Sequence, residues 1–219
     1  MEIIGQAFAY IQNHLDDFQK ALVAHLQLSL LALFLAAVTC VPLGILTSRF
    51  GTVARVIING VGIARVIPSI AVLLVLLPVI GVGFTPAVVT LTLLAFPPIL
   101  INTDAGMRGL DPATLEAARG MGMAWYESLF EVELPLALPV IIGGIRTATI
   151  EIIASATLAT FIGAGGFGDF ITQGLGGNDN RVVLVGAIPV AILALVAELL
   201  LATLQRLVSP TTSASFKTT

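Results

Sequence analysis

Residues 66–103 read VIPSIAVLLVLLPVIGVGFTPAVVTLTLLAFPPILINT, which is 38 consecutive positions without a charged side chain. An α-helix rises about 1.5 Å per residue, so a single helix of this length would measure about 57 Å, whereas the hydrocarbon core of a bilayer is about 30 Å thick. The stretch must therefore fold back on itself within a membrane. Gly81 and Gly83 stand in its middle and favour a tight reversal. We expect one span near 56–78 and a second near 86–104.

The composition of the whole chain agrees with a membrane protein. Of its 219 residues, 57% are hydrophobic and 11% are charged, whereas soluble domains average about 45–50% and about 25%. An uncharged stretch predicts a span near 26–48, and two further apolar stretches predict spans near 134–162 and 182–204. The expected fold class is therefore all-α: a polytopic integral membrane protein of about five transmembrane helices, with residues 1–219 forming one transmembrane domain.

The same counts exclude several function classes. A net charge of −3 without a basic run argues against a nucleic-acid partner. Cys40 is the one cysteine, so a disulfide scaffold is excluded, and with two histidines the chain lacks the ligands of an ordinary zinc site. A Ser-His-Asp triad is excluded because no histidine follows His25. The chain has no P-loop motif, so we expect no cofactor on it and any ATP hydrolysis to occur on a separate subunit.

The orientation follows from the tendency of Lys and Arg to lie in cytoplasmic loops. If the polar segment 105–133 is cytoplasmic, six basic residues share its side: Arg49, Arg55, Arg108, Arg119, Arg206 and Lys217. Only Lys20 and Arg181 then lie outside. We therefore expect the N-terminus outside, with residues 1–20 as an external amphipathic helix, and a cytoplasmic C-terminus that ends in a flexible tail over 209–219.

The polar segment 105–133 carries the most specific signal. Asp111 followed by Pro112 is typical of a helix start. Apolar residues follow at spacings of three and four and predict one stripe on a short amphipathic helix over 111–131: Leu115, Ala118, Gly122, Trp125 and Leu129. From periodicity alone, this helix is either a connector that lies on the membrane surface or a docking element for a cytoplasmic partner.

The segment also contains a spaced pattern: Glu116, Ala117, Ala118, Gly122, Val132, Leu134 and Pro135. The pattern resembles the EAA motif of the permeases of type I ABC importers. The resemblance implies a MetI-like permease fold and a coupling helix that sits in a groove of a cytoplasmic ABC ATPase, which binds the ATP and Mg²⁺. It further implies a second permease copy or homologue and an extracytoplasmic substrate-binding protein, in a bacterial or archaeal cytoplasmic membrane.

Further stretches are similar to permeases for glycine betaine, choline and carnitine. They are IPSIA at 67–71, GGIRTAT at 143–149, and ATL at 156–158 leading into IGAGGFG at 162–168. This resemblance implies the alternating-access import of a small osmoprotectant. Methionine permeases share the size and a similar glycine-rich segment, so a methionine or other amino-acid importer is the alternative. An ion-driven secondary transporter is the alternative from a different class.

Four charged residues fall inside the predicted spans: Arg65, Arg146, Glu151 and Glu198. A charge at the bilayer centre costs about 2.5–3.5 kcal/mol, so each should face the bundle interior or an aqueous path. Arg146 and Glu151 lie about 140° apart around one helix, so they need other partners. We expect Glu198 to pair with Arg65. The in-span charges either join packed helices or line the translocation path.

Two sets of residues are candidates for transport roles. Along the path, the candidates are Ser69, Arg146, Glu151 and Thr157. At the outer end of the fourth span, Gly163, Gly165 and Gly166 are candidates for an outer gate. Their stretch matches a dinucleotide-binding pattern by letter, but it follows a membrane span rather than a strand, so no nucleotide site is expected there.

Overall fold

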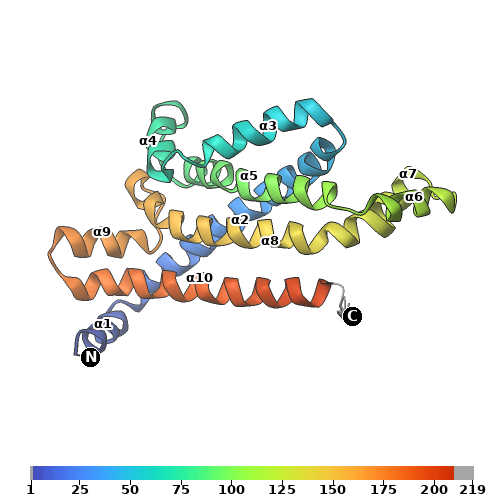
Figure 1. The fold of residues 1–219 in the computed structure, drawn as a ribbon. Helices are drawn as coiled ribbons and strands as arrows, with labels where there is room; N and C mark the ends of the chain where they lie inside the picture. The colour runs from blue at the N-terminus through green and yellow to red at the C-terminus, as the bar shows by residue number, and fades with distance from the viewer. Residues whose placement is uncertain (1, 210–219) are drawn as a thin grey trace, which may run out of the picture.

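The computed structural model describes residues 2–209, with the side chains of all of these residues except 52–55 and 64. All regular elements within this range are helical, which confirms the all-α fold class (Figure 1). The helices are α1 (Glu2–Asn13), α2 (Leu15–Ser48), α3 (Gly51–Ala64), α4 (Ser69–Ile80), α5 (Phe84–Arg108), α6 (Pro112–Gly120), α7 (Trp125–Glu127), α8 (Leu134–Ser155), α9 (Gly168–Gly176) and α10 (Asn180–Val208). A π-helical turn, Ser128–Glu133, precedes α8, and a 3-10 helix, Ala156–Ile162, follows it. The tail predicted over 209–219 lies outside the described residues beyond Ser209.

Four helical stretches of the described chain are long and apolar enough to cross a membrane. They are α2, α5, the continuous stretch Trp125–Ile162 and α10. These stretches contain the first, third, fourth and fifth predicted spans. The fourth span changes from α-helix to 3-10 helix at Ala156, before its expected end at 162.

The span expected near 56–78 is two helices, so the prediction of one continuous helix was wrong. The chain leaves α3 at Ala64 and begins α4 at Ser69. Pro68 explains the break, because a proline disfavours helical backbone in the residue before it. The 12 residues of α4 measure about 18 Å, which is too short to cross the bilayer core.

The predicted reversal inside 66–103 is confirmed. α4 ends at Ile80, and Gly81 and Gly83 adopt φ of +80° and +106°. Residues that carry a Cβ rarely adopt such positive φ angles. The backbone N–H of Gly83 donates to the carbonyl oxygen of Ile162 at 2.6 Å. This bond joins the α4–α5 turn to the end of the 3-10 helix, so the two glycine-rich turns lie at the same end of the molecule.

The core lies between α2, α5 and α8 and contains many small side chains among its leucines and isoleucines. The fully buried small residues include Ala32, Ala36, Cys40, Ala87, Ala95, Ala148, Ala156 and Ala159. Two glycines bring backbones still closer: a Cβ on Gly44 would lie 2.5 Å from the Cβ of Thr103, and one on Gly144 would lie 2.7 Å from the carbonyl oxygen of Pro98. Small residues at helix contacts are typical of membrane bundles.

The remaining elements gather at the two ends of the bundle. α1 and α9 pack against α10 at one end, and α6 and α7 project from the opposite end (Figure 1). Within α1, Ala7 is buried and Tyr10 and Ile11 pack on the same apolar cluster, while most of the other side chains are exposed. The start of α1 and the end of α10 lie at opposite ends of the molecule (Figure 1).

Candidate functional site: the projecting segment and the in-span charges

The projecting segment begins with the helix start predicted from sequence. The side chain of Asp111 accepts a hydrogen bond from the backbone N–H of Ala113 at 3.0 Å, with Pro112 in the first turn. α6 ends where the N–H of Met121 donates to the carbonyl of Ala117 at 3.0 Å, and Gly122 follows with φ of +82°. A Cβ at Gly122 would meet nothing within 4 Å. Glycine is therefore required there by backbone conformation rather than by space.

The single amphipathic helix expected over 111–131 is not formed. After Gly122 the chain restarts as α7 at Trp125 and runs through the π-helical turn into α8. Ala118 is buried, whereas Trp125 is 77% exposed. The predicted stripe was wrong because the left-handed turn at Gly122 resets the helical phase between these two residues.

The tip of the segment exposes both polar and apolar motif residues. Glu116 and Ala117 are exposed on α6, and Pro135 is exposed at the start of α8, next to the half-buried Leu134. The exposed large apolar side chains of the tip are Met121, Trp125, Tyr126 and Phe130. The tip extends beyond the ends of α5 and α8 (Figure 1). A cluster of exposed apolar side chains on a projection is typical of a surface that binds another protein.

Ion pairs fasten this projection to the membrane helices. Glu133 is nearly buried; its carboxylate lies 2.5 Å from Nη2 of Arg49, just after α2, and accepts from the hydroxyl of Ser128 at 3.1 Å. In α5, Arg108 donates to Asp104 at 2.9 Å and to the carbonyl oxygen of Thr47 at 2.7 Å. These contacts join the start of α8 and the end of α5 to the end of α2.

The charges inside the spans form two separate pairs. Nε of Arg146 in α8 donates to Glu198 of α10 at 2.7 Å, and its Nη1 donates to Gln205 at 3.1 Å. Nη2 of Arg65, just after α3, donates to Glu151 of α8 at 3.3 Å. The expectation that Arg146 and Glu151 do not pair with each other and have other partners is confirmed. The expected Arg65–Glu198 pair was wrong, because Glu198 faces α8 and Glu151 takes its place beside Arg65.

A cavity of about 700 Å³ lies beside the Arg65–Glu151 pair. Its lining includes Arg65, Pro68, Ser69, Phe96, Pro97 and Glu151. The structure thus brings together two of the four candidate path residues, Ser69 and Glu151. Arg146 lies at the α8–α10 contact instead, and the hydroxyl of Thr157 donates to the carbonyl of Ala154 at 2.7 Å. Sequence reasoning did not place a helix break at this cavity, although Pro68 was a signal for it.

The candidate gate glycines form the turn between the 3-10 helix and α9. Gly163, Gly165 and Gly166 adopt φ of +69°, +79° and +102°. A Cβ on Gly166 would lie 3.3 Å from Nδ1 of His25 in α2. His25 is fully buried, and its Nε2 contacts the carbonyl oxygen of Ile153 at 3.1 Å. The turn therefore rests closely on α2, whose His25 in turn contacts α8, at the end of the bundle opposite α6.

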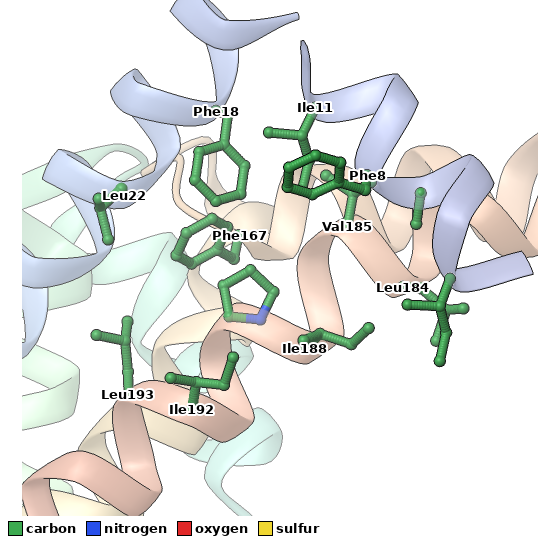
Figure 2. A pocket seen from close by; sticks show the side chains of 13 residues that line it. Phe8, Ile11, Phe18, Leu22, Phe167, Leu184, Val185, Ile188, Ile192 and Leu193 are labelled. Carbon is green, nitrogen blue, oxygen red and sulfur yellow. The ribbon is translucent and has the colours of Figure 1, made fainter. Parts of the chain in front are cut away.

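A second hollow of about 350 Å³ lies between α1, the start of α2 and α10 (Figure 2). Its walls are entirely apolar and include Phe8, Phe18, Phe167 and Ile188. The rings of Phe18 and Phe167 lie 5.3 Å apart between their centroids. A hollow without a polar group offers nothing to orient a charged small molecule, so the cavity beside Arg65 and Glu151 is the better candidate for a transport site.

The described residues contain no group of three or more His, Cys, Asp or Glu side chains that could hold a metal ion. The groups that remain for recognition at the cavity are therefore one guanidinium, one carboxylate, two hydroxyls (Ser69 and Ser155) and one aromatic ring. This set suits the binding of a small charged molecule.

Comparison with known proteins identifies the family. The model of the "binding-protein-dependent transport system inner membrane component" family matches residues 40–213. The chain belongs to this family. It is therefore a multi-pass inner-membrane permease, a transport subunit that works in a binding-protein-dependent system. This family membership confirms the transport function expected from the motif.

Curated relatives of the permease cover nearly all of its length. The glycine betaine/carnitine/choline transport system permease protein OpuCB of Bacillus subtilis (strain 168) is 40% identical over 207 residues, which is 94% of this chain and 95% of that protein. The choline transport system permease protein OpuBB of the same organism is 45% identical over 92% of this chain and 93% of its own. The osmoprotectant import permease protein OsmW of Salmonella typhimurium is 39% identical over 85% and 89%.

A solved structure shows the same fold. The inward-facing MetNI methionine ABC transporter matches with a TM-score of 0.80 and 24% identity, covering 90% of this chain and 98% of that one. The permease therefore has the MetI-like fold of ABC importers.

Proposed function

We propose that this permease imports a small quaternary ammonium osmoprotectant, such as glycine betaine, choline or carnitine, by alternating access. The observation that carries the proposal is near full-length similarity to curated permeases named for these compounds. The cavity beside Arg65 and Glu151 supports it, because a carboxylate and the face of Phe96 are groups that attract a quaternary ammonium. Ser69 lies in the same lining and completes the proposed path.

The proposed motor is a separate cytoplasmic ABC ATPase that binds ATP and Mg²⁺. Its docking surface on the permease comprises the exposed motif residues Glu116, Ala117, Gly122 and Pro135, together with the exposed apolar tip. The motif residues Ala118, which is buried, and Leu134, which is half-buried, support that surface. A second permease copy or homologue completes the transmembrane unit, and an extracytoplasmic substrate-binding protein delivers the substrate. The turn at Gly163, Gly165 and Gly166 shapes the outer gate, with the N-terminus outside and the C-terminus cytoplasmic.

The substrate assignment is tested by uptake into proteoliposomes. The permease, its ATPase and its binding protein are reconstituted, and radiolabelled glycine betaine, choline, carnitine and methionine are offered outside, with ATP inside. ATP-dependent uptake of at least one quaternary ammonium compound is expected. Uptake of methionine alone would reassign the substrate, and uptake that survives without ATP but collapses with the ion gradient would indicate a secondary transporter.

The proposed ATPase interface at the α6–α7 turn can be tested by comparing substitutions at two nearby glycines. A Cβ added at Gly120 or at Gly122 would meet nothing within 4 Å, but only Gly122 has a positive φ. Gly122→Ala should strain the turn and reduce both ATPase co-purification and coupled ATP hydrolysis, whereas Gly120→Ala should leave them near wild type. Equal behaviour of the two variants would contradict the assignment of this turn to the ATPase interface.

A further inference from the structure

The Arg65–Glu151 pair differs from the other ion pair inside the membrane. Arg146 is braced by Glu198 and by Gln205, and Gln205 itself donates to the carbonyl of Pro139 at 2.9 Å. Arg65 is joined to Glu151 by one contact of 3.3 Å, and the two side chains are 43% and 40% exposed. Both line the cavity of about 700 Å³. The pair is therefore open to a solute, and its two charges can be reached separately.

The backbone at this cavity is interrupted at membrane depth. The break between α3 and α4 contributes Arg65 and residues 66–68 to the lining, followed by Ser69 at the first turn of α4. Non-helical backbone inside a membrane is tolerated where it lines a cavity or is buried in protein. The first N–H groups of a helix lack intrahelical acceptors and carry partial positive charge. The Arg65 side of the cavity is therefore electropositive.

The opposite wall has the complementary character. Glu151 reaches the cavity from α8, and Phe96 of α5 is the aromatic residue in the same lining. Carboxylates and aromatic faces both attract quaternary ammonium groups. The cavity thus presents an anion-binding side and a cation-binding side, which are joined by an ion pair when no solute is present.

We infer that Arg65 and Glu151 form an exchangeable ion pair that selects zwitterionic substrates on the transport path. This inference rests on the proposed function. The carboxylate of a betaine or carnitine binds Arg65 and the start of α4, while its trimethylammonium group binds Glu151 and Phe96. A zwitterion replaces each partner of the broken pair, so neither protein charge is left uncompensated. Choline carries the cation alone, so it offers Arg65 no partner and makes one favourable charge contact fewer than a zwitterion does.

The permease selects zwitterions while they pass through the cavity, where they bind only weakly. A site on a transport path must bind its substrate weakly enough to release it. One aromatic ring and one carboxylate, both partly solvated, fit that requirement. The permease then adds its own preference for zwitterions over cations to that of the binding protein, because discrimination is a difference between the two binding free energies.

The first test compares the uptake of glycine betaine and choline by the reconstituted complex. Arg65→Gln should lower the betaine-to-choline uptake ratio by about tenfold, the effect of losing about 1.4 kcal/mol of interaction with one substrate only. Arg146→Gln is the matched control, because it breaks the braced pair outside the cavity and should leave the ratio unchanged. An unchanged ratio in Arg65→Gln, with uptake of both substrates retained, overturns the inference.

A second measurement keeps the inference testable if Arg65→Gln fails to assemble. Cys40 is the single native cysteine and is buried, so Ser69→Cys provides a reporter at the cavity with little background. Glycine betaine should protect this cysteine from a charged methanethiosulfonate reagent at lower concentration than choline does. Equal protection by the two solutes, or none by either, contradicts the inference. If the wild-type complex imports no quaternary ammonium compound at all, the proposed function fails instead.

Discussion

At the residue scale, Glu133 holds the coupling segment to the membrane helices. Its carboxylate is nearly buried and binds Arg49 and Ser128. The pair links the end of α2 to the start of α8, which are 84 residues apart. A buried carboxylate with two hydrogen-bonding partners fixes the direction in which the tip leaves the bundle.

Glu133→Ala should therefore destabilise the permease. Loss of hydrogen bonds to a charged group costs about 1–2 kcal/mol here, at the low end because Arg49 is 42% exposed and can be hydrated. The melting temperature in detergent should fall, and ATPase co-purification should fall with it. Glu131→Ala is the control, because Glu131 is exposed on the same turn; a fall of the same size in this variant would contradict the role given to Glu133.

A second residue, Asp179, begins α10. Its Oδ1 accepts from the backbone N–H and from Nε of Arg181, both at 2.9 Å. These hydrogen bonds, with the guanidinium charge, lower the pKa of Asp179 from 3.8 to about 2. A carboxylate whose folded-state pKa is lowered stabilises the fold above its unfolded pKa and loses that effect as the pH falls through the folded value.

The difference in melting temperature between the wild type and Asp179→Ala should accordingly stay constant from neutral pH down to about pH 4. It should then shrink as the pH falls towards 2. Asp179→Asn keeps a capping acceptor without an acidic proton, so its own contribution to the cap should not vary over this range. A wild-type advantage over Asp179→Ala that grows with falling pH would contradict the assigned hydrogen bonds.

At the element scale, close contact between helices depends on glycine. A Cβ on Gly144 would lie 2.6 Å from the Cβ of Asn102 and 2.7 Å from the carbonyl oxygen of Pro98. Both atoms belong to α5, so the added methyl group must push α5 and α8 apart. Overpacking of this kind costs about 1–3 kcal/mol.

Gly144→Ala should thus lower thermal stability by that amount, and Gly60→Ala provides the contrast. Gly60 also lies inside a helix, but a Cβ there would meet nothing within 4 Å. Its replacement should stabilise α3 by up to about 1 kcal/mol through helix propensity. Thermal unfolding in detergent distinguishes the two variants, and a neutral Gly144→Ala would show that α5 and α8 are not packed at this distance.

Elements also mark where sequence reasoning succeeded and where it failed. The fold-back of 66–103 could be predicted because length alone forbids a single helix, and its glycines have the expected positive φ. The apolar stripe predicted through Ala118 and Trp125 does not continue across Gly122. One residue with a left-handed backbone changes the direction of the chain, so the side chains after it face other directions than a continuous helix would give them. Local sequence patterns predict helices well, but they do not predict which face a helix presents after a turn such as that at Gly122.

At the scale of the whole molecule, the ion pairs between residues far apart in the chain could not be predicted from the sequence. Arg65 and Glu151 are 86 residues apart, and Arg146 and Glu198 are 52 apart. In the sequence, Arg65 and Arg146 could each have paired with more than one in-span glutamate. Only the packing of α8 against its neighbours determines which glutamate each arginine contacts. The candidate path was recovered in part for the same reason: Ser69 and Glu151 meet at one cavity, whereas Arg146 faces another helix.

The proposed orientation can be tested with single cysteines, since Cys40 is buried. Lys20 is exposed near the start of α2, and Glu131 is exposed on the projecting segment. In intact cells that express the permease alone, a membrane-impermeant maleimide should label Lys20→Cys and not Glu131→Cys. In inverted vesicles the pattern should reverse. The opposite result would place the N-terminus in the cytoplasm.

The alanine-rich core between α2, α5 and α8 has a consequence for motion. Alanine has no side-chain rotamers, so helices that meet through alanine can shift along one another without any side chain having to find a new rotamer. Shear between packed helices is one of the two common ways in which domains close. The alanine contacts among α2, α5 and α8 therefore lower the conformational cost of sliding these helices during an alternating-access cycle.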